Sequence, residues 1–295
     1  MIPIDFSGKV ALVTGVGDNE SFAWFISKAL KAAGAKIVLA CHPRMVNIVE
    51  GILGGEKYRE SRLLPYGGGE LQVEKVFAMD ARFDTMADVD EATRNDKRWS
   101  KYPFYGIKEV VDAVGKEFGG IDMLIHSIAF SREILKAMVE TSRSAYFEAL
   151  GISAYSLTSL LRAATPYMEN RPGGAAAVGL TYLGGTRVVP YYGGGMSTAK
   201  AALQIDAAQL AHNLGKKNIR VNLISAGPYA SRAARSIRPG EFEKSITYAA
   251  ERSPLPRGIE PEEVANATVF LCSPLASAIS GHTLFVDCGY NVMGV

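Results

Sequence analysis

A tyrosine and a lysine that could act together in catalysis stand in the second half of the chain. Tyr192 precedes the glycine run 193–195, and Lys200 follows eight positions after Tyr192. Both side chains are poor acid–base groups at their ordinary pKa values of about 10. A fixed phenol can nevertheless donate a hydrogen bond to a developing oxyanion, and a nearby ammonium group stabilises negative charge. Three successive glycines would leave the backbone open to close approach by a cofactor or substrate.

A glycine-containing turn lies near the start of the chain, between an apolar run and a helical stretch. Gly15 and Gly17 follow the apolar run, and Ser21 and Phe22 lead into the helix. Glycines at the first strand-to-helix turn let backbone N–H groups approach a pyrophosphate at the N-terminus of a helix. The usual third glycine is absent, and Ser21 or Ala23 would occupy its place. The segment predicts a dinucleotide site, with a glycine turn that binds no ligand as the alternative.

The residues after the next two expected strands bear on the choice of cofactor. NAD-dependent enzymes usually carry an acid after the second strand, where it binds the adenosine ribose. His42 and Arg44 stand there instead, and they would either accept the 2′-phosphate of NADPH or lie in an exposed loop. Asp80, followed by Ala81, ends the third strand. Asp80 would accept the adenine amino group or serve only as a turn residue, and the choice between NADH and NADPH stays open.

Short apolar runs alternate with helical stretches along the whole chain. This alternation predicts an α/β fold with a single Rossmann-type, doubly wound parallel sheet and helices on both faces. We expect helices at 22–33, ended by Gly34, at 107–118, and at 196–214, ended by Gly215. The expected strands are 10–14, 36–41, 75–79, 122–126, 176–181, 220–224 and 283–287. No internal repeat or interdomain linker interrupts the pattern, so we expect one domain over residues 1–295.

Two segments exceed what a minimal fold of this kind needs. Residues 44–74 form a Gly-rich, charged connection, and residues 81–105 are charged and largely aperiodic. Long connections of this kind are uncommon in compact domains unless they serve a function or an interface. We interpret both segments as surface additions, with a role in an interface as the alternative.

The bulk composition narrows the class of function. The chain is 48% hydrophobic and 21% charged, as is usual for a globular domain, and its net charge of +2 favours neither nucleic acid nor a membrane surface. No stretch approaches the ~20 apolar residues that cross a bilayer. Three widely spaced cysteines fit neither a disulfide framework nor a metal site, which indicates a reducing compartment. We expect no metal and no signal or transit peptide.

The spacing of the tyrosine and the lysine narrows the family. Short-chain dehydrogenases normally carry Tyr-x3-Lys, whereas Tyr192 and Lys200 are eight positions apart. With this longer spacing, the segment 180–202 resembles the enoyl-[acyl-carrier-protein] reductases, a divergent branch of that family, and above all their plant, apicomplexan and chlamydial members. The resemblance covers nearly the whole chain. It includes Phe83-Asp84-Thr85, His126-Ser127-Ile128-Ala129, Thr141-Ser142-Arg143, Ser225-Ala226-Gly227-Pro228 and the segment 273–278.

The resemblance implies a reaction and roles for individual residues. Hydride would pass from NADH to Cβ of a trans-2-enoyl thioester on acyl carrier protein, in type II fatty-acid biosynthesis, with protonation at Cα. Tyr192 would donate to the thioester carbonyl, Lys200 would bind the nicotinamide ribose hydroxyls, and Tyr182 would line the pocket or assist protonation. The implied cofactor contacts are Gly15, Gly17, Ser21, Phe22, His42, Asp80, Ala81, Ser127, Ile128, Thr181, Lys200, Ala226, Gly227, Pro228 and Ser231. The implied substrate contacts are Ala129, Phe130, Tyr182 and Tyr192.

Four features depart from the pattern of this subgroup. Tyr191 replaces a glycine, so two adjacent phenols compete for the catalytic role, and the register favours Tyr192. The segment 21–24 replaces Gly-Tyr-Gly-Trp, His42 occupies the place of a tryptophan that stacks on adenine, and Phe130 replaces an asparagine. Two of these departures, in the segment 21–24 and at His42, lie at the expected cofactor site.

Three arginines follow the turn that ends at Pro228. Arg232, Arg235 and Arg238 recur every three residues within an expected substrate lid near 229–250. One helical face would be basic there, and an acidic carrier protein would dock on it by charge steering. A solvated helix face is the alternative.

Two other functions stay open at this stage. A short-chain carbonyl reductase acting on 3-oxoacyl substrates would use the same fold and the same tyrosine–lysine chemistry. A non-catalytic dinucleotide-binding protein would tolerate the altered cofactor turn. The resemblance further implies a homotetramer, and a location in the cytoplasm of a bacterium or, with a transit peptide removed, in a plastid.

Overall fold

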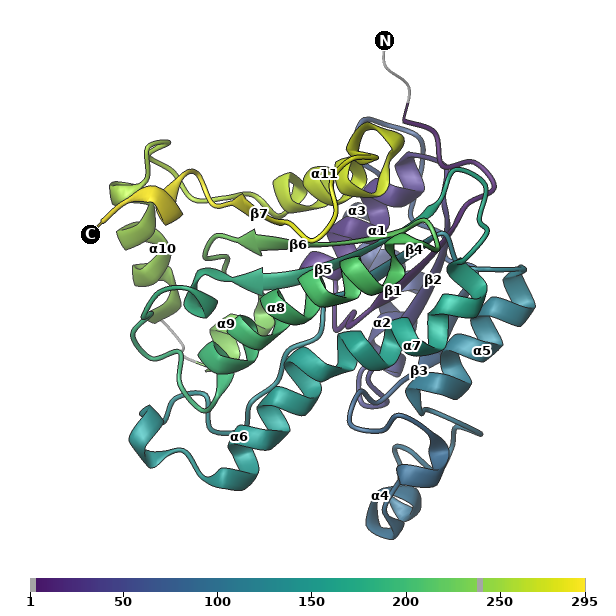
Figure 1. The fold of residues 1–295 in the computed structure, drawn as a ribbon, viewed down its shortest axis with the longest axis horizontal. Helices are drawn as coiled ribbons and strands as arrows, with labels where there is room; N and C mark the ends of the chain where they lie inside the picture. Colours follow the sequence, from purple (N-terminus) through teal and green to yellow (C-terminus); the bar gives the residue numbers. More distant parts are fainter. Residues whose placement is uncertain (1–3, 238–240, 295) are drawn as a thin grey trace.

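A sheet of seven parallel strands forms the centre of the molecule (Figure 1). The computed structural model of the chain describes residues 4–237 and 241–294. The strands are β1 (Val10–Thr14), β2 (Lys36–Cys41), β3 (Lys75–Ala78), β4 (Met123–His126), β5 (Ala175–Tyr182), β6 (Ile219–Ala226) and β7 (Thr283–Val286). They lie in the order β3-β2-β1-β4-β5-β6-β7, which is the expected doubly wound arrangement. The order in which successive strands are added to the sheet reverses between β1 and β4, and ligands of such sheets bind at the carboxyl ends of the strands near this point.

Helices cover both faces of the sheet, because its central strands are apolar on both sides. Helices α1, α2 and α11 share one core with the sheet, and α5, α7 and α8, on the near side in Figure 1, share the other. The α-helices are α1 (Phe22–Ala32), α2 (Val46–Gly54), α3 (Arg59–Arg62), α4 (Glu91–Asn95), α5 (Ile107–Phe118), α6 (Arg143–Leu150), α7 (Ser156–Met168), α8 (Met196–Gly215), α9 (Arg232–Ile237), α10 (Glu241–Arg252) and α11 (Pro261–Cys272). A π-helical turn spans Gly151–Tyr155, and 3-10 turns span Glu56–Tyr58, Met86–Asp88, Met138–Glu140, Leu183–Gly185, Pro274–Ala276 and Tyr290–Val292.

The predicted strands all form, with ends that differ by at most two residues. The helix expected at 196–214 includes Gly215, which we had placed after its end. The chain turns three residues later, where Asn218 takes a left-handed φ of 56° and its amide donates to the Gly215 carbonyl. The first helix ends as expected, since Gly34 has a φ of 97°.

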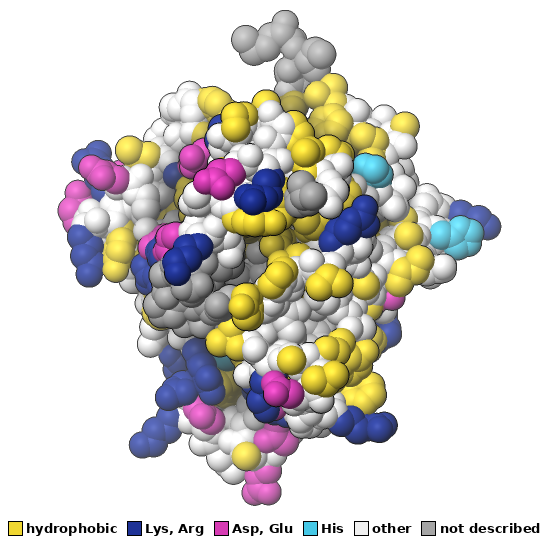
Figure 2. All heavy atoms as spheres, turned by 90° about the vertical axis from the view of Figure 1, so that its left-hand side faces the viewer, with side chains coloured by type: hydrophobic (Ala, Val, Ile, Leu, Met, Phe, Trp, Pro, Cys, Tyr) yellow, Lys and Arg dark blue, Asp and Glu magenta, His cyan; other side chains and the backbone are white. Residues whose placement is uncertain are grey.

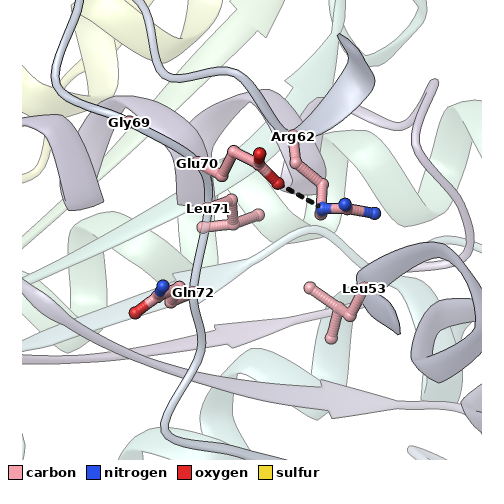
Figure 3. Close-up of a pocket in the computed structure, with 6 residues that line it drawn as sticks. All are labelled: Leu53, Arg62, Gly69, Glu70, Leu71 and Gln72. Atoms are coloured by element: carbon pink, nitrogen blue, oxygen red, sulfur yellow. Dashed lines mark hydrogen bonds and ion pairs between the residues drawn. The ribbon is translucent and has the colours of Figure 1, made fainter. Parts of the chain in front are cut away.

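The two additions are more than surface elaboration. Helix α2 of the first addition buries Val49 and Ile52 in the core. Arg62 of the same addition donates to the carbonyl groups of Ile52 and Gly55, and it pairs with Glu70. A pocket of about 420 Å³ lies beside this ion pair. Figure 3 shows the side chains that line it, none of which is a predicted site residue. The prediction of a surface addition was wrong because a short amphipathic helix is hard to detect in a Gly-rich segment.

The second addition also contributes to the core. Trp99 and Tyr105 are buried, while exposed charged residues lie on the short α4 and on both sides of it. The predicted lid region contains α9 and α10, and residues 238–240 between them lie outside the described residues. Within residues 4–237 and 241–294, none of the helices combines the length and apolar character required to span a bilayer.

Candidate active site

The carboxyl ends of the strands bring the predicted site residues to one edge of the sheet. Figure 2 looks onto this edge, toward which β5 and β6 point in Figure 1, and shows hydrophobic side chains gathered across its middle. Gly15 follows β1, Ser127 follows β4, Tyr182 ends β5 and Gly227 follows β6. Segments that are far apart in sequence therefore form one surface, as expected for a doubly wound sheet.

Two tyrosines pack against each other where β5 ends. The rings of Tyr182 and Tyr192 lie with their centroids 5.0 Å apart and their planes at 68°. Gly184 makes this packing possible, because a Cβ there would lie 2.6 Å from Cδ1 of Tyr192. Burial raises the pKa of Tyr192 well above its usual range, and burial followed by the Tyr290 phenol raises the pKa of Tyr182 to about 12. Both groups are therefore neutral phenols at pH 7, suited to donate a hydrogen bond.

The two adjacent phenols have different environments. Tyr191 has a φ of 65° and is 66% exposed. Tyr192 turns inward, where the Ser197 hydroxyl donates to its carbonyl oxygen at 2.9 Å. This geometry favours Tyr192 as the catalytic phenol, in agreement with the register.

Lys200 lies buried in α8, directly behind the end of β5. Its Nζ donates to the carbonyl oxygen of Leu180 at 2.8 Å, and burial lowers its pKa from 10.5 to about 8. Among the described residues it forms no ion pair with an acid and no hydrogen bond with Tyr192. An ammonium group has three N–H donors, so donors of Lys200 stay available to ribose hydroxyls. The Thr181 hydroxyl donates to the Lys200 carbonyl oxygen at 3.4 Å and lies in the same layer.

The glycine run serves a different purpose from the one predicted. A Cβ on Gly193 would lie 1.9 Å from the Lys136 carbonyl oxygen, and one on Gly194 would lie 2.4 Å from the Glu133 carbonyl. The Gly193 amide also donates to Ile134 at 2.9 Å. The backbone that approaches these glycines is thus the chain's own segment 131–146. The expectation of room for a cofactor or substrate here was wrong at Gly193 and Gly194, because a segment remote in sequence fills that space.

The turn after β1 has the features of a dinucleotide site. Gly15 has a φ of 78°, and a Cβ there would lie 2.0 Å from the Ser127 carbonyl oxygen. A Cβ on Gly17 would meet only the Met45 methyl group, at 3.6 Å. Ser21 begins α1 without capping it by a side-chain hydrogen bond, and the first turn of α1 contains no acid. This helix N-terminus is therefore compatible with an anion.

The adenosine end of the predicted site holds a compact polar cluster. The carboxylate of Asp80 accepts hydrogen bonds from Nε and Nη2 of Arg82 and from Nε1 of Trp99, at 2.7 to 3.1 Å. His42 lies beside them, with Nε2 3.7 Å from Oδ2 of Asp80. Burial would raise the pKa of Asp80, but the hydrogen bonds and charge of Arg82 lower it. Asp80 thus has partners within the chain, while Ala81 beside it is half-buried.

The predicted substrate contacts follow β4. Ala129 is exposed and Phe130 is 48% exposed, while Ser127 and Ile128 before them are half-buried. The hydroxyl of Ser153 accepts from the Phe130 amide at 2.9 Å and donates to the Phe130 carbonyl oxygen at 3.1 Å. Ser153 is not among the predicted site residues, because this serine lies in the π-helical turn and no local sequence pattern distinguishes it.

The segment after β6 completes the edge. Ala226 is buried, the Gly227 amide donates to Val286 at 2.8 Å, and Pro228 is half-buried. The Ser231 hydroxyl accepts from the Ala234 amide at the start of α9. Phe22 of the first turn stacks against Tyr229 at 5.1 Å, which joins this segment to the predicted dinucleotide turn.

The arginines of α9 face the turn after β1. Arg232 pairs with Asp18 and Glu20, and Arg235 pairs with Glu20. These pairs neutralise much of the charge that a docking face for an acidic carrier protein needs. Arg238 lies outside the described residues.

His126 is a buried structural histidine. Its Nε2 lies 2.8 Å from the Ser156 hydroxyl, and burial followed by the charge of Lys200 lowers its pKa to about 3. It is therefore neutral at pH 7. Among the described residues, the His, Cys, Asp and Glu side chains form no group able to hold a metal ion.

Comparisons with known proteins identify the family. The family described as enoyl-(acyl carrier protein) reductase matches residues 105–291. The chain is 45% identical over all its length to the chloroplastic NADH-dependent enoyl-[acyl-carrier-protein] reductase of Arabidopsis thaliana, of which it covers 74%. It is 35% identical to the corresponding reductase of a Nostoc species, over 99% of this chain and 100% of that one. The chain belongs to the enoyl-[acyl-carrier-protein] reductases.

Solved structures of this family have the same fold. The Plasmodium berghei enoyl-acyl-carrier-protein reductase, crystallised with triclosan, superposes with a TM-score of 0.92 at 38% identity, covering 97% of this chain and 98% of that one. The reductase of Anaplasma phagocytophilum, in complex with NAD, superposes with a TM-score of 0.79 at 31% identity over 98% and 96%. The predicted single Rossmann-type sheet and the predicted family are therefore confirmed.

Proposed function

We propose that this reductase uses NADH to reduce the carbon–carbon double bond of trans-2-enoyl thioesters carried by acyl carrier protein, in type II fatty-acid biosynthesis. The observation that carries the proposal is the pair of stacked, neutral phenols of Tyr182 and Tyr192 at the strand edge, above the buried Lys200. Membership of the family gives the reaction class. The geometry gives the chemical roles.

Tyr192 would stabilise the charge that develops on the substrate. As hydride adds to Cβ, negative charge moves to the thioester oxygen, and a phenol held in place donates its hydrogen bond to that oxygen. The raised pKa of Tyr192 suits this role, because the proton stays on the phenol until the oxygen needs it. Tyr182 packs edge-on against Tyr192 and fixes its ring.

Lys200 would hold the cofactor. Its uncompensated buried ammonium group, with donors to spare beyond Leu180, fits the ribose hydroxyls of a dinucleotide. Gly15, Gly17 and the N-terminus of α1 would accept the pyrophosphate. When bound, NADH supplies the hydride. The segment from Ser127 to Phe130, tied to the π-helical turn by Ser153, would border the nicotinamide and the acyl chain.

The test follows NADH oxidation with crotonyl-CoA and an enoyl carrier-protein thioester, beside a 3-oxoacyl thioester. We expect turnover of the two enoyl substrates only. Turnover of the ketone alone would show a carbonyl reductase instead. Binding of NADH without turnover of any thioester would show the non-catalytic alternative.

We further propose that the active form is a homotetramer and that catalysis takes place in the cytoplasm of a bacterium or in a plastid. The chloroplastic and bacterial relatives support the compartment, and the exposed apolar residues of α8 support the assembly.

A further inference from the structure

The turn after β2 carries positive charge where a dinucleotide would place its adenosine ribose. Strand β2 pairs with β1, and the Gly15 amide donates to the Ala40 carbonyl oxygen at 3.0 Å. The Met45 methyl group lies 3.6 Å from the position of a Cβ on Gly17. Residues 42–45 therefore flank the predicted pyrophosphate turn. An acid at this place would bind the 2′-hydroxyl of NADH and repel a 2′-phosphate, and this chain has none there.

Arg44 is held in a position to bind an anion. Its guanidinium carbon lies 5.1 Å from the centroid of the Trp99 ring. Among the described residues, the Arg44 side chain forms no ion pair and donates no hydrogen bond. A guanidinium group that stacks through its face keeps its N–H donors free in the plane of the group. The fixed orientation lowers the entropy that phosphate binding would otherwise cost.

The neighbouring acid does not cancel this charge. Asp80 directs its carboxylate to Arg82 and to Nε1 of Trp99. The charge of Asp80 is thus balanced by Arg82, which also lies over Trp99 at 5.7 Å. His42 meets the same ring edge-on at 5.3 Å, and burial lowers its pKa, so that it adds no positive charge at pH 7. The surface formed by His42, Arg44, Arg82 and Trp99 keeps one unbalanced cation, that of Arg44.

We propose that this surface binds the 2′-phosphate of NADPH, with Arg44 as the specificity-determining residue, so that the enzyme accepts NADPH as well as NADH. The use of NADPH in the reaction rests on the proposed function, whereas the binding of the 2′-phosphate does not depend on it. Arginine recognises phosphate by charge-assisted, often bidentate hydrogen bonds. The relatives from Arabidopsis thaliana and Nostoc are described as NADH-dependent, so acceptance of NADPH would distinguish this chain from them.

The test measures binding without catalysis. Calorimetry on the protein compares AMP with 2′,5′-ADP, which differ only in the 2′-phosphate. We expect the wild type to bind 2′,5′-ADP at least as tightly as AMP. Arg44→Ala should lower the preference for 2′,5′-ADP over AMP by about 10- to 100-fold, the range for one charged phosphate contact. Arg44→Lys should recover only part of it, because an ammonium group lacks the planar fork.

Lys57→Ala is the matched control. Lys57 is an exposed cation over a ring of the same addition, 4.9 Å from the centroid of Tyr58, and its removal should leave the preference unchanged. Two results would overturn the proposal: wild-type binding of 2′,5′-ADP tenfold weaker than that of AMP, or an unchanged preference in Arg44→Ala. If Arg44→Ala lowers the preference as expected but no enoyl thioester is reduced with NADH or NADPH, the proposed reaction is wrong. The proposed 2′-phosphate site at Arg44 would still stand.

Discussion

Buried ionisable side chains define the chemistry of this protein at the scale of single residues. Tyr182 and Tyr192 keep their protons because burial penalises a phenolate, and Lys200 binds its proton weakly because burial penalises an ammonium ion. A substrate oxyanion would accept a hydrogen bond from a phenol, and the ribose hydroxyls of a cofactor would interact with the ammonium group. The buried groups that lower the stability of the folded protein would therefore favour ligand binding.

Removal of the Tyr192 hydroxyl tests its role directly. We expect Tyr192→Phe to lower kcat by about 100-fold or more, the loss typical of one oxyanion donor. The ring stays in contact with Tyr182, so the fold should be retained. Tyr191→Phe is the control, since Tyr191 is 66% exposed. Steady-state kinetics with crotonyl-CoA gives both values. Equal losses in the two variants would disprove the assignment.

Lys200 should destabilise the protein when no cofactor is bound. The lowering of the Lys200 pKa from 10.5 to about 8 corresponds to a destabilisation of the folded state by about 3 kcal/mol at pH 7. The hydrogen bond to Leu180 offsets about 1 kcal/mol of this cost. We therefore expect Lys200→Met to raise the free energy of unfolding by about 2 kcal/mol and to abolish cofactor binding.

The pH dependence of that gain has a defined sign. Because the folded pKa is the lower one, the cost of Lys200 is complete below pH 8 and disappears as the pH rises through 10.5. The difference between variant and wild type in urea unfolding should therefore shrink from pH 7 to pH 10. A variant that is less stable than wild type at pH 7 would mean that Lys200 is needed for packing.

Sequence alone identified most of these residues but not their partners. The register selected Tyr192 over Tyr191, and in the structure Tyr192 packs against Tyr182 while Tyr191 is exposed. Asp80 appeared free to bind adenine, whereas Arg82 and Trp99 occupy its carboxylate. Trp99 lies 19 positions away in an aperiodic segment, so no spacing could have revealed the contact.

At the scale of elements, the loop before α8 depends on glycine for packing. Gly193→Ala would place a methyl group 1.9 Å from the Lys136 carbonyl oxygen, which forces two backbone segments apart. We expect a loss of about 1–3 kcal/mol in the free energy of unfolding, as for other overpacked sites, and a higher KM for the enoyl substrate, because the same loop carries Tyr192.

Gly51→Ala is the matched control for Gly193→Ala. Gly51 lies inside α2, and nothing lies within 4 Å of a Cβ built there. That variant should gain up to about 1 kcal/mol from helix propensity. Urea unfolding and initial rates measure both variants. Equal stability of Gly193→Ala and wild type would show that the loop can move aside at no cost.

Elements were predictable to the extent that their hydrophobic patterns are strong. All seven strands and the helices α1, α5 and α8 follow from apolar runs and glycine ends. Helix α2 and the buried Trp99 do not, since their apolar residues are few and stand among glycines and charges. The π-helical turn at Gly151–Tyr155 has no sequence signal at all, although Ser153 within it positions Phe130.

At the scale of the whole molecule, α8 exposes a large apolar side chain to solvent while its other side packs against the core. Leu203 and Ala207 face the core, while Ile205 on the same helix is 60% exposed. Exposed apolar residues on a long helix are favourable when a second chain covers them. In a homotetramer built from identical chains, such a residue would be repeated at each symmetric contact, so one substitution acts several times.

Assembly can therefore be tested with one charge. We expect sedimentation equilibrium of the wild type to give the mass of four chains. Ile205→Glu should shift it to dimers or monomers, because each contact would bury an unpaired carboxylate. Ile48→Glu is the control, since Ile48 is 42% exposed on α2 at the opposite face of the sheet and should leave the mass unchanged. A tetramer that persists in Ile205→Glu would place the interface on other elements, and a monomeric wild type would refute the assembly. The fold would survive either result, since the two cores on the faces of the sheet are formed within one chain.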